Sequence, residues 1–253
     1  MDLFLPLMMG AVVGFFLGFF GSGGSVMAVP ILVYVLGMPP KEAIASSLAI
    51  VGATAVSGSV QKLRSHQVCF KIGVIFALFG VAGAFSGARL SVYLSGTQQL
   101  VIFSILMLVS ALSMWFKKQS MSKVEGDACQ MASYLAASLG FGVGLLTGLV
   151  GVGGGFLIVP ALVMLGGLNL RMAMGTSLFI IALNALSALV AYLGIINFNW
   201  EIILIFILAS SLASMLGAKL SNKVDGEKMK KLFSVFIFLL GILLLIKNLR
   251  GSL

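Results

Sequence analysis

Two clusters of small residues are the part of this sequence whose residue types and spacing could do chemistry. They span residues 21–25 (GSGGS) and 151–155 (GVGGG), and each interrupts an apolar stretch and precedes a proline, Pro30 or Pro160. Glycine destabilises a helix because it adds backbone entropy and no packing surface. Each cluster therefore predicts a break in a helix, and a helix that begins at such a break offers free N–H groups to an anion.

Two such helix starts that face each other would form one binding site for a small anion, with hydroxyl and amide side chains as further donors. We expect the substrate-binding residues to be Gly21, Ser22, Gly23, Gly24, Ser25, Ser46, Ser47, Gly151, Gly153, Gly154, Gly155, Thr176, Ser177 and Asn184. The alternative is that the small residues only let membrane helices pack closely. The occurrence of two matching clusters, each with its proline, favours the anion site.

The composition indicates that these clusters lie within a membrane. Hydrophobic residues make up 60% and charged residues 9% of the 253 residues, and the mean hydropathy is +1.17. A soluble domain carries about 25% charged residues. Apolar runs of about 20 residues, long enough to cross a bilayer, recur along the chain and do not alternate with period two. We therefore predict an all-α integral membrane protein.

The chain contains two copies of one unit. Residue n of the first copy matches residue n + 130 of the second without a gap from 14/144 to 118/248, and 30 of these 105 pairs are identical. Copies of this length predict a duplicated transporter half, with residues 1–118 as the first transmembrane repeat, 119–130 as a linker and 131–253 as the second repeat. Each repeat should contain a glycine-broken helical hairpin near the midplane.

The positive charges predict that the two repeats are inverted. Segment 61–71 holds three Lys and Arg residues and its equivalent 191–201 holds none, whereas segment 89–100 holds one and its equivalent 219–230 holds four. Short basic loops stay in the cytoplasm, so equivalent loops should lie on opposite sides. Inverted repeats need an odd number of crossings each: three if the glycine hairpin is re-entrant, five if both of its arms cross. The linker, residues 117–130, is expected to be cytoplasmic.

The remaining reactive side chains argue against an enzyme and against a cation transporter. All seven carboxylates lie at predicted helix ends or in loops, whereas cation transporters usually keep one within the membrane. The single histidine, His66, lies in a basic loop, and Cys69 and Cys129 are far apart and show no metal-ligand spacing. We expect no metal, no cofactor, no catalytic residue and no disulfide. The net charge of +9 should set orientation in the membrane and not bind nucleic acid.

Three kinds of motif occur at equivalent places in both repeats. They are the glycine clusters with their prolines, the triplets Ala45-Ser46-Ser47 and Gly175-Thr176-Ser177, and the triplets Gly87-Ala88-Arg89 and Gly217-Ala218-Lys219. Together they resemble the TauE/SafE sulfite-exporter family of bacterial membrane permeases, and the resemblance covers essentially the whole chain. It implies transport of sulfite, organosulfonates such as sulfoacetate, or related small sulfur oxyanions across the bacterial inner membrane.

We therefore predict a secondary transporter, in the first instance an exporter, that moves a small sulfur-containing anion by alternating access. The alternatives are an anion channel, whose flux would not saturate at modest concentrations, and a permease for a non-sulfur small organic anion. The expected partners are the anion and the lipid bilayer, and a homodimer is compatible with a transporter of this size.

Overall fold

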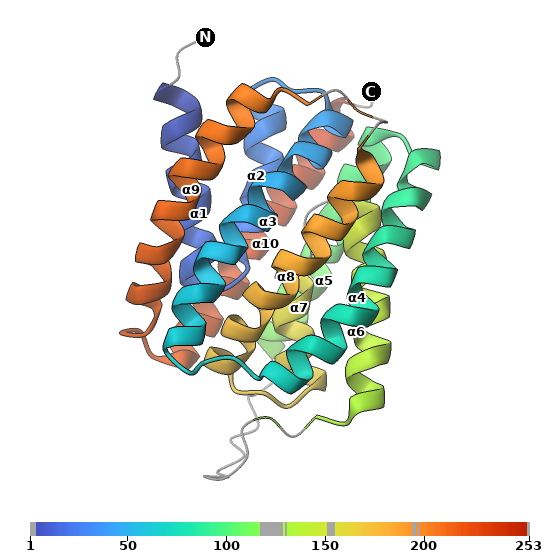
Figure 1. Cartoon of the computed structure of the whole chain (residues 1–253). Helices are drawn as coiled ribbons and strands as arrows, with labels where there is room; N and C mark the ends of the chain where they lie inside the picture. Colours follow the sequence, from blue (N-terminus) through green and yellow to red (C-terminus); the bar gives the residue numbers. More distant parts are fainter. Residues whose placement is uncertain are drawn as a thin grey trace.

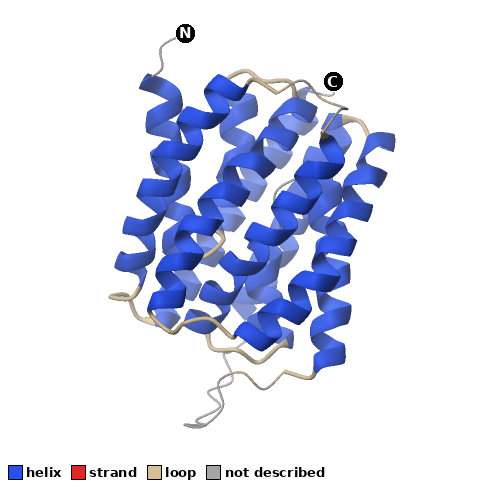
Figure 2. Ribbon diagram, in the orientation of Figure 1, coloured by secondary structure: helices blue, strands red, loops and turns tan. Residues whose placement is uncertain are grey.

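The computed structural model describes residues 4–116, 129, 131–150, 155–193, 196 and 198–251. Over these residues the chain is helical and contains no strand (Figure 2), which confirms the predicted all-α fold. The helices are α1 (Phe4–Phe20), α2 (Gly23–Tyr34), α3 (Pro40–Arg64), α4 (Phe70–Leu90), α5 (Gly96–Phe116), α6 (Ser133–Val150), α7 (Gly155–Pro160), α8 (Leu170–Tyr192), α9 (Trp200–Ser221) and α10 (Gly226–Gly251). A 3-10 turn (Ser91–Tyr93) follows α4, and a π-helical segment (Ala161–Leu165) extends α7.

Seven of the described helices are long and apolar enough to cross a membrane, namely α3, α4, α5, α6, α8, α9 and α10. An apolar segment in lipid folds as a helix because the helix satisfies its own backbone hydrogen bonds. Helix α9 shows the resulting pattern: Leu208, Leu212 and Leu216, spaced by one turn, are exposed. Helices α1, α2 and α7 with its π-helical extension are shorter.

The first glycine break folds α1 and α2 into a hairpin. Helix α2 runs back along α1 and packs closely on it. The contact is so close that a Cβ added to Gly24 would lie 2.0 Å from the carbonyl oxygen of Val13. Figure 2 shows the α1–α2 turn inside the bundle, and Figure 1 shows α3 starting at the end of the bundle where α1 starts. Helix α2 thus returns toward the end of the bundle where α1 starts (Figure 1), and α3 to α5 are the described helices of the first half that are long and apolar enough to cross a membrane.

The two ends of the bundle differ in charge. The α3–α4 and α9–α10 connections, the end of α5 and the start of α6 lie at one end, and the start of α1 and the end of α10 lie at the other (Figure 1). We call the first the basic end, after its side chains Lys62, Arg64, Lys71, Arg171, Lys219, Lys223, Lys228, Lys230 and Lys231. The described helix ends and connections at the opposite end carry Lys41, Arg89 and Lys247.

The helices of the two halves correspond in position and in packing. Helices α3, α4 and α5 begin at residues 40, 70 and 96, and α8, α9 and α10 begin 130 residues later, at 170, 200 and 226. Helix α1 packs along α9 as α6 packs along α4, and α3 packs on α9 as α8 packs on α4. We call the α3–α9 contact the first seam and the equivalent α4–α8 contact the second seam.

Glycines line the closest helix contacts. A Cβ on Gly14 of α1 would lie 2.0 Å from the carbonyl oxygen of Ser210 in α9, and one on Gly144 of α6 would lie 2.3 Å from that of Gly80 in α4. Further glycines recur every four residues on both helices: Gly10 and Gly18 in α1, Gly140 and Gly148 in α6. Small residues at this spacing let membrane helices approach closely, and for these glycines that explanation is sufficient.

Cys69 and Cys129 form a disulfide, so the prediction that neither cysteine is paired is wrong. Their Cα atoms lie 5.7 Å apart although 60 residues separate them in the sequence. The prediction considered spacing along the chain, whereas pairing depends on the fold. Cys69 precedes α4 and Cys129 precedes α6, and these two helices start at the same end and pack along each other.

Candidate anion-binding site

The first glycine break gives α2 an open N-terminus. Gly21 has a φ of +71°, a left-handed conformation that favours glycine, and a Cβ there would lie 2.6 Å from the Cβ of Met174. Ser22 precedes the first helical residue of α2, and its hydroxyl makes no capping hydrogen bond. Because the first N–H groups of a helix have no carbonyl partner within it, this end presents donors together with the positive end of the helix dipole.

The start of α7 lies against the first break. A Cβ on Gly155, the first residue of α7, would lie 2.8 Å from the Cβ of Ser22 and 2.6 Å from Cδ1 of Ile181. Helices α2 and α7 also pack against each other. The predicted site residues Gly151, Gly153 and Gly154 lie outside the described residues.

Two predicted site residues on α8 bind backbone groups of the opposite half. The Ser177 hydroxyl lies 2.8 Å from the carbonyl oxygen of Gly21, and it also lies 2.8 Å from that of Met174. Thr176 Oγ1 accepts a hydrogen bond from the N–H of Cys69 at 2.9 Å. Ser177 therefore holds the first break in place, and Thr176 ties α8 to the start of α4.

Four other predicted site residues have a structural role in the first half. The hydroxyls of Ser25 and Ser47 each donate to a backbone carbonyl one turn earlier. A Cβ on Gly23 or Gly24 would lie 2.7 or 2.0 Å from the nearest atom of α1. Close packing thus explains Gly24, which faces the α1 backbone, and is compatible with Gly23, which faces the Phe20 side chain; this is the alternative explanation that the sequence left open.

Three predicted site residues bury polar atoms that have no hydrogen-bond partner in the described part of the chain. They are Ser22 (0% exposed), Ser46 (1%) and Asn184 (1%), and in Asn184 both amide atoms are unpaired. An unsatisfied buried polar group costs about 1–3 kcal/mol. Such groups are rare in folded proteins, and each one calls for an explanation, such as a bound water or ion, a functional role or strain.

The repeat shows which partner Asn184 lacks. Its equivalent in the first half is Thr54, whose hydroxyl lies 2.5 Å from that of Ser210 across the first seam. The equivalent of Ser210 in the second seam is Gly80, and a Cβ on Gly80 would lie 2.7 Å from both amide atoms of Asn184. The second seam thus places an amide opposite a residue that has no side chain to bind it.

Lys62 is a functional candidate that sequence reasoning missed. It lies in the last turn of α3, and its side chain is 1% exposed. Its Nζ donates to Gln67 Oε1 at 2.9 Å, Ser221 Oγ at 2.7 Å and Asn222 Oδ1 at 2.9 Å. One signal was present in the sequence: the equivalent residue is Tyr192, so the two repeats differ in charge at this position.

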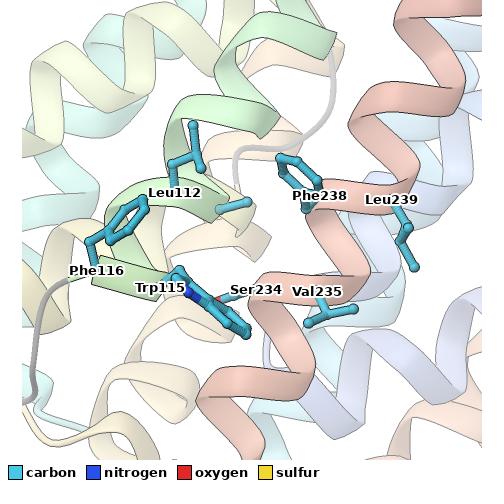
Figure 3. A pocket seen from close by; sticks show the side chains of 8 residues that line it. Leu112, Trp115, Phe116, Ser234, Val235, Phe238 and Leu239 are labelled. Carbon is cyan, nitrogen blue, oxygen red and sulfur yellow. The ribbon is translucent and has the colours of Figure 1, made fainter.

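The apolar groove in Figure 3 is unsuited to an anion. It has a volume of about 290 Å³ and lies between α5 and α10, where Trp115 and Phe238 contribute aromatic walls. Its single hydroxyl, that of Ser234, donates to the carbonyl oxygen of Lys230 at 2.9 Å. Several of its side chains are exposed, Phe116 most of all, so the groove is part of the surface that would face lipid.

The described carboxylates lie away from the glycine breaks. Glu42, Glu201 and Glu227 occupy the first turns of α3, α9 and α10, and Asp225 lies in the α9–α10 connection. Within the described ranges no three His, Cys, Asp or Glu side chains are grouped so that they could hold a metal ion. The described carboxylates thus lie at helix starts and in a connection, and not in the turn between α1 and α2.

Seven helices of the described ranges are long and apolar enough to span a membrane, which defines a multi-pass membrane protein. The family described as "Sulfite exporter TauE/SafE" matches residues 6–244. The chain belongs to this family.

Similar proteins are described as membrane transporters. A "Probable membrane transporter protein" of Xylella fastidiosa (strain Temecula1) is 30% identical over 237 residues, which cover 92% of this chain and 91% of that protein. The "Probable membrane transporter protein YunE" of Bacillus subtilis (strain 168) is 26% identical over 263 residues, which cover 95% of this chain and 96% of that protein. No solved structure matches the chain with statistical significance.

Proposed function

We propose that this protein is a secondary transporter that exports a small sulfur-containing anion, such as sulfite, sulfoacetate or another organosulfonate, across the bacterial inner membrane. The description of its family supports this substrate class. The observation that carries the proposal is the buried, unpaired hydroxyl of Ser22 at the open N-terminus of α2, at the point where Gly155 of the other half touches it. Hydroxyl and N–H donors at a helix N-terminus suit the oxygens of an oxyanion.

The two halves would act as inverted repeats that open the site alternately to each side. This arrangement is supported by the correspondence of helix starts, 130 residues apart, and by the equivalent packing of the two seams. In transporters built from inverted repeats, the substrate binds where broken helices of both halves meet. Opening of the first seam at the basic end and of the second seam at the opposite end would then expose Ser22 and Gly155 in turn.

The basic end is proposed to face the cytoplasm, together with the linker, because short basic loops remain there. The Cys69–Cys129 disulfide lies at this same end, and disulfides are rare on cytoplasmic faces. Orientation is therefore tested directly, by single cysteines at His66, Lys223 and Asn199 labelled with a membrane-impermeant maleimide in intact cells. We expect labelling from outside at Asn199 alone; labelling at His66 and Lys223 instead would reverse the orientation.

Transport is tested with purified protein in proteoliposomes and radiolabelled sulfite. We expect saturable flux, acceleration by unlabelled sulfite on the other side, and a loss of about tenfold or more in kcat/KM in Ser22→Ala, because an anion would lose one hydrogen bond in a buried site. Ser138→Ala, at an exposed serine of α6, is the matched control and should transport normally. Normal transport by Ser22→Ala would remove Ser22 from the site.

The alternatives give different results in the same assay. Flux that rises linearly with concentration and shows no counter-transport would indicate an anion channel. Thermal unfolding in detergent separates substrate classes, since a ligand at 100 times its dissociation constant stabilises the folded state by about 2.7 kcal/mol. Stabilisation by a small carboxylate, with none by sulfite or sulfoacetate, would indicate a permease for a non-sulfur anion.

A further inference from the structure

Lys62 is a buried cation for which the described residues supply no carboxylate. The ion pair found in the described ranges joins Lys231 and Glu227 within α10. The three acceptors of the Lys62 ammonium, on Gln67, Ser221 and Asn222, are all neutral. Burying an uncompensated charge is costly, and within membrane proteins such charges commonly mark ion or substrate pathways.

The charge of Lys62 lies where three helices of the two halves converge. Lys62 lies in the last turn of α3, and Ser221 ends α9. Arg171, at the start of α8, donates to the carbonyl oxygen of Val224, two residues after Asn222, at 3.2 Å. A second cation thus borders the same corner of the basic end. The corner attracts anions, and its contacts hold the first seam closed.

The second seam shows that closing this contact does not require a charge. Tyr192 and Ser91 are the equivalents of Lys62 and Ser221, and their hydroxyl oxygens lie 2.5 Å apart. In each pair the serine hydroxyl also donates to a backbone carbonyl one turn earlier, of Ala88 or Ala218. The serine is therefore the acceptor in both seams. A neutral phenol serves as donor in the second seam, so the lysine adds charge and not simply a hydrogen bond.

We propose that Lys62 binds the transported anion at the basic end of its path. When α9 moves away from α3, the ammonium loses Ser221 and Asn222 as acceptors, and oxygens of the anion replace them. Because an ammonium has three donors and all three are used in the closed seam, the anion and the seam compete for the same groups. This inference rests on the proposed function, and it assigns Lys62 two roles there: anion ligand and contact that keeps the basic end closed.

The test compares Lys62→Met, which removes the charge, with Lys62→Arg, which keeps it, and with Tyr192→Phe as the matched change in the second seam. We measure sulfite transport in proteoliposomes of known orientation and sulfite-induced thermal stabilisation in detergent. Lys62→Met should raise KM for sulfite presented at the basic end by about tenfold or more, since a hydrogen bond to a charged group is lost. Lys62→Arg should stay within about threefold of the parent protein, and Tyr192→Phe should not change KM.

A purely structural lysine would give another pattern. In that case Lys62→Met would lower the melting temperature and leave KM at both ends unchanged, and the proposal would be overturned. Ser221→Ala keeps the charge of Lys62 and weakens the closed seam. It therefore still tests the competition between seam and anion if Lys62→Met folds poorly. It should retain or improve sulfite affinity at the basic end; a tenfold loss of affinity would contradict competition between the seam and the anion.

The outcome also separates this proposal from the proposed substrate class. If the parent protein is stabilised by phosphate or chloride and not by sulfite, and Lys62→Met abolishes that stabilisation, Lys62 is an anion ligand and the sulfur substrate is wrong. If the parent protein transports sulfite and Lys62→Met does so with the same KM, only the role of Lys62 is wrong. If none of sulfite, sulfoacetate, phosphate and chloride stabilises the parent protein or is transported by it, both proposals fail.

Discussion

The first and second seams have equivalent backbones and different polar side chains. At the middle of the first seam Thr54 and Ser210 pair with each other, whereas at the middle of the second seam Asn184 faces Gly80 and has no partner in the described part of the chain. At the helix ends the unusual group lies in the first seam and the ordinary hydrogen-bonded pair in the second. The first seam ends in a buried cation, and the second ends in a neutral pair of hydroxyls.

At each level, one seam contains a neutral hydrogen-bonded pair that would also close the other seam. A hydroxyl pair at mid-depth and a phenol–serine pair at the end satisfy their hydrogen bonds without a ligand. The two positions that depart from these solutions are Asn184, whose amide has no partner in the described part of the chain, and Lys62, whose buried ammonium has only neutral acceptors. Departures from local consistency of this kind are expected at functional sites, so the difference between the seams makes Asn184 and Lys62 candidates for a functional role.

The largest effect should come from breaking the framework that supports both seams. In Gly144→Val the Cβ would lie 2.3 Å from the carbonyl oxygen of Gly80, so α6 must move away from α4. We expect the free energy of unfolding to fall by about 3 kcal/mol and gel filtration to show little monodisperse protein, because the helix backbone cannot shift as easily as a side chain. Gly142→Val on the same helix is the control, since nothing lies within 4 Å of its Cβ. Equal yields would show that the α4–α6 contact tolerates separation.

The next effect should come from making the second seam resemble the first. The double variant Gly80→Ser with Asn184→Thr replaces the unpaired amide by the hydroxyl pair of the first seam. We expect unchanged or higher thermal stability, because an unsatisfied group is removed. We also expect sulfite transport to fall about tenfold or more, since two hydroxyls that bond to each other no longer offer a free hydrogen bond to the anion.

The reciprocal variant is the control for that swap. Thr54→Asn with Ser210→Gly gives the first seam the polar groups of the second, and it should lower thermal stability without adding transport. Full transport by the Gly80→Ser, Asn184→Thr double variant would show that the unpaired amide of Asn184 is unrelated to the substrate path.

The amino-acid sequence predicts the parts of this fold that depend on local composition. Apolar runs predicted the helices, and the cluster at residues 21–25 predicted a break that the structure shows as a turn between α1 and α2. Predicting this break needs no knowledge of tertiary contacts, because glycine lowers helix stability at any interior position. The repeat likewise follows from residue identities alone.

Contacts between distant residues could not be predicted in this way. The Cys69–Cys129 disulfide depends on α4 and α6 starting side by side, and the burial of Lys62 depends on α9 covering the end of α3. Neither the disulfide nor the burial of Lys62 can be inferred from the spacing of residues along the chain. The same limit applies to the glycines: the sequence does not separate Gly24, which packs against α1, from Gly21, whose backbone conformation itself favours glycine.

The smallest effect should come from the neutral end of the second seam. Tyr192→Phe removes the donor to Ser91, and one hydrogen bond between neutral groups contributes about 1 kcal/mol to the free energy of unfolding. Ser221→Ala in the first seam should cost more, about 1.5–3 kcal/mol, because its partner there is a cation. Thermal unfolding of Tyr192→Phe, Ser91→Ala and the double variant gives the coupling energy of the neutral pair, and the same cycle on Lys62→Met and Ser221→Ala gives that of the charged pair. Equal coupling energies would mean that Lys62 behaves as a neutral donor in the closed seam. The Lys62–Ser221 and Tyr192–Ser91 pairs would then differ in side-chain size and not in the effect of charge.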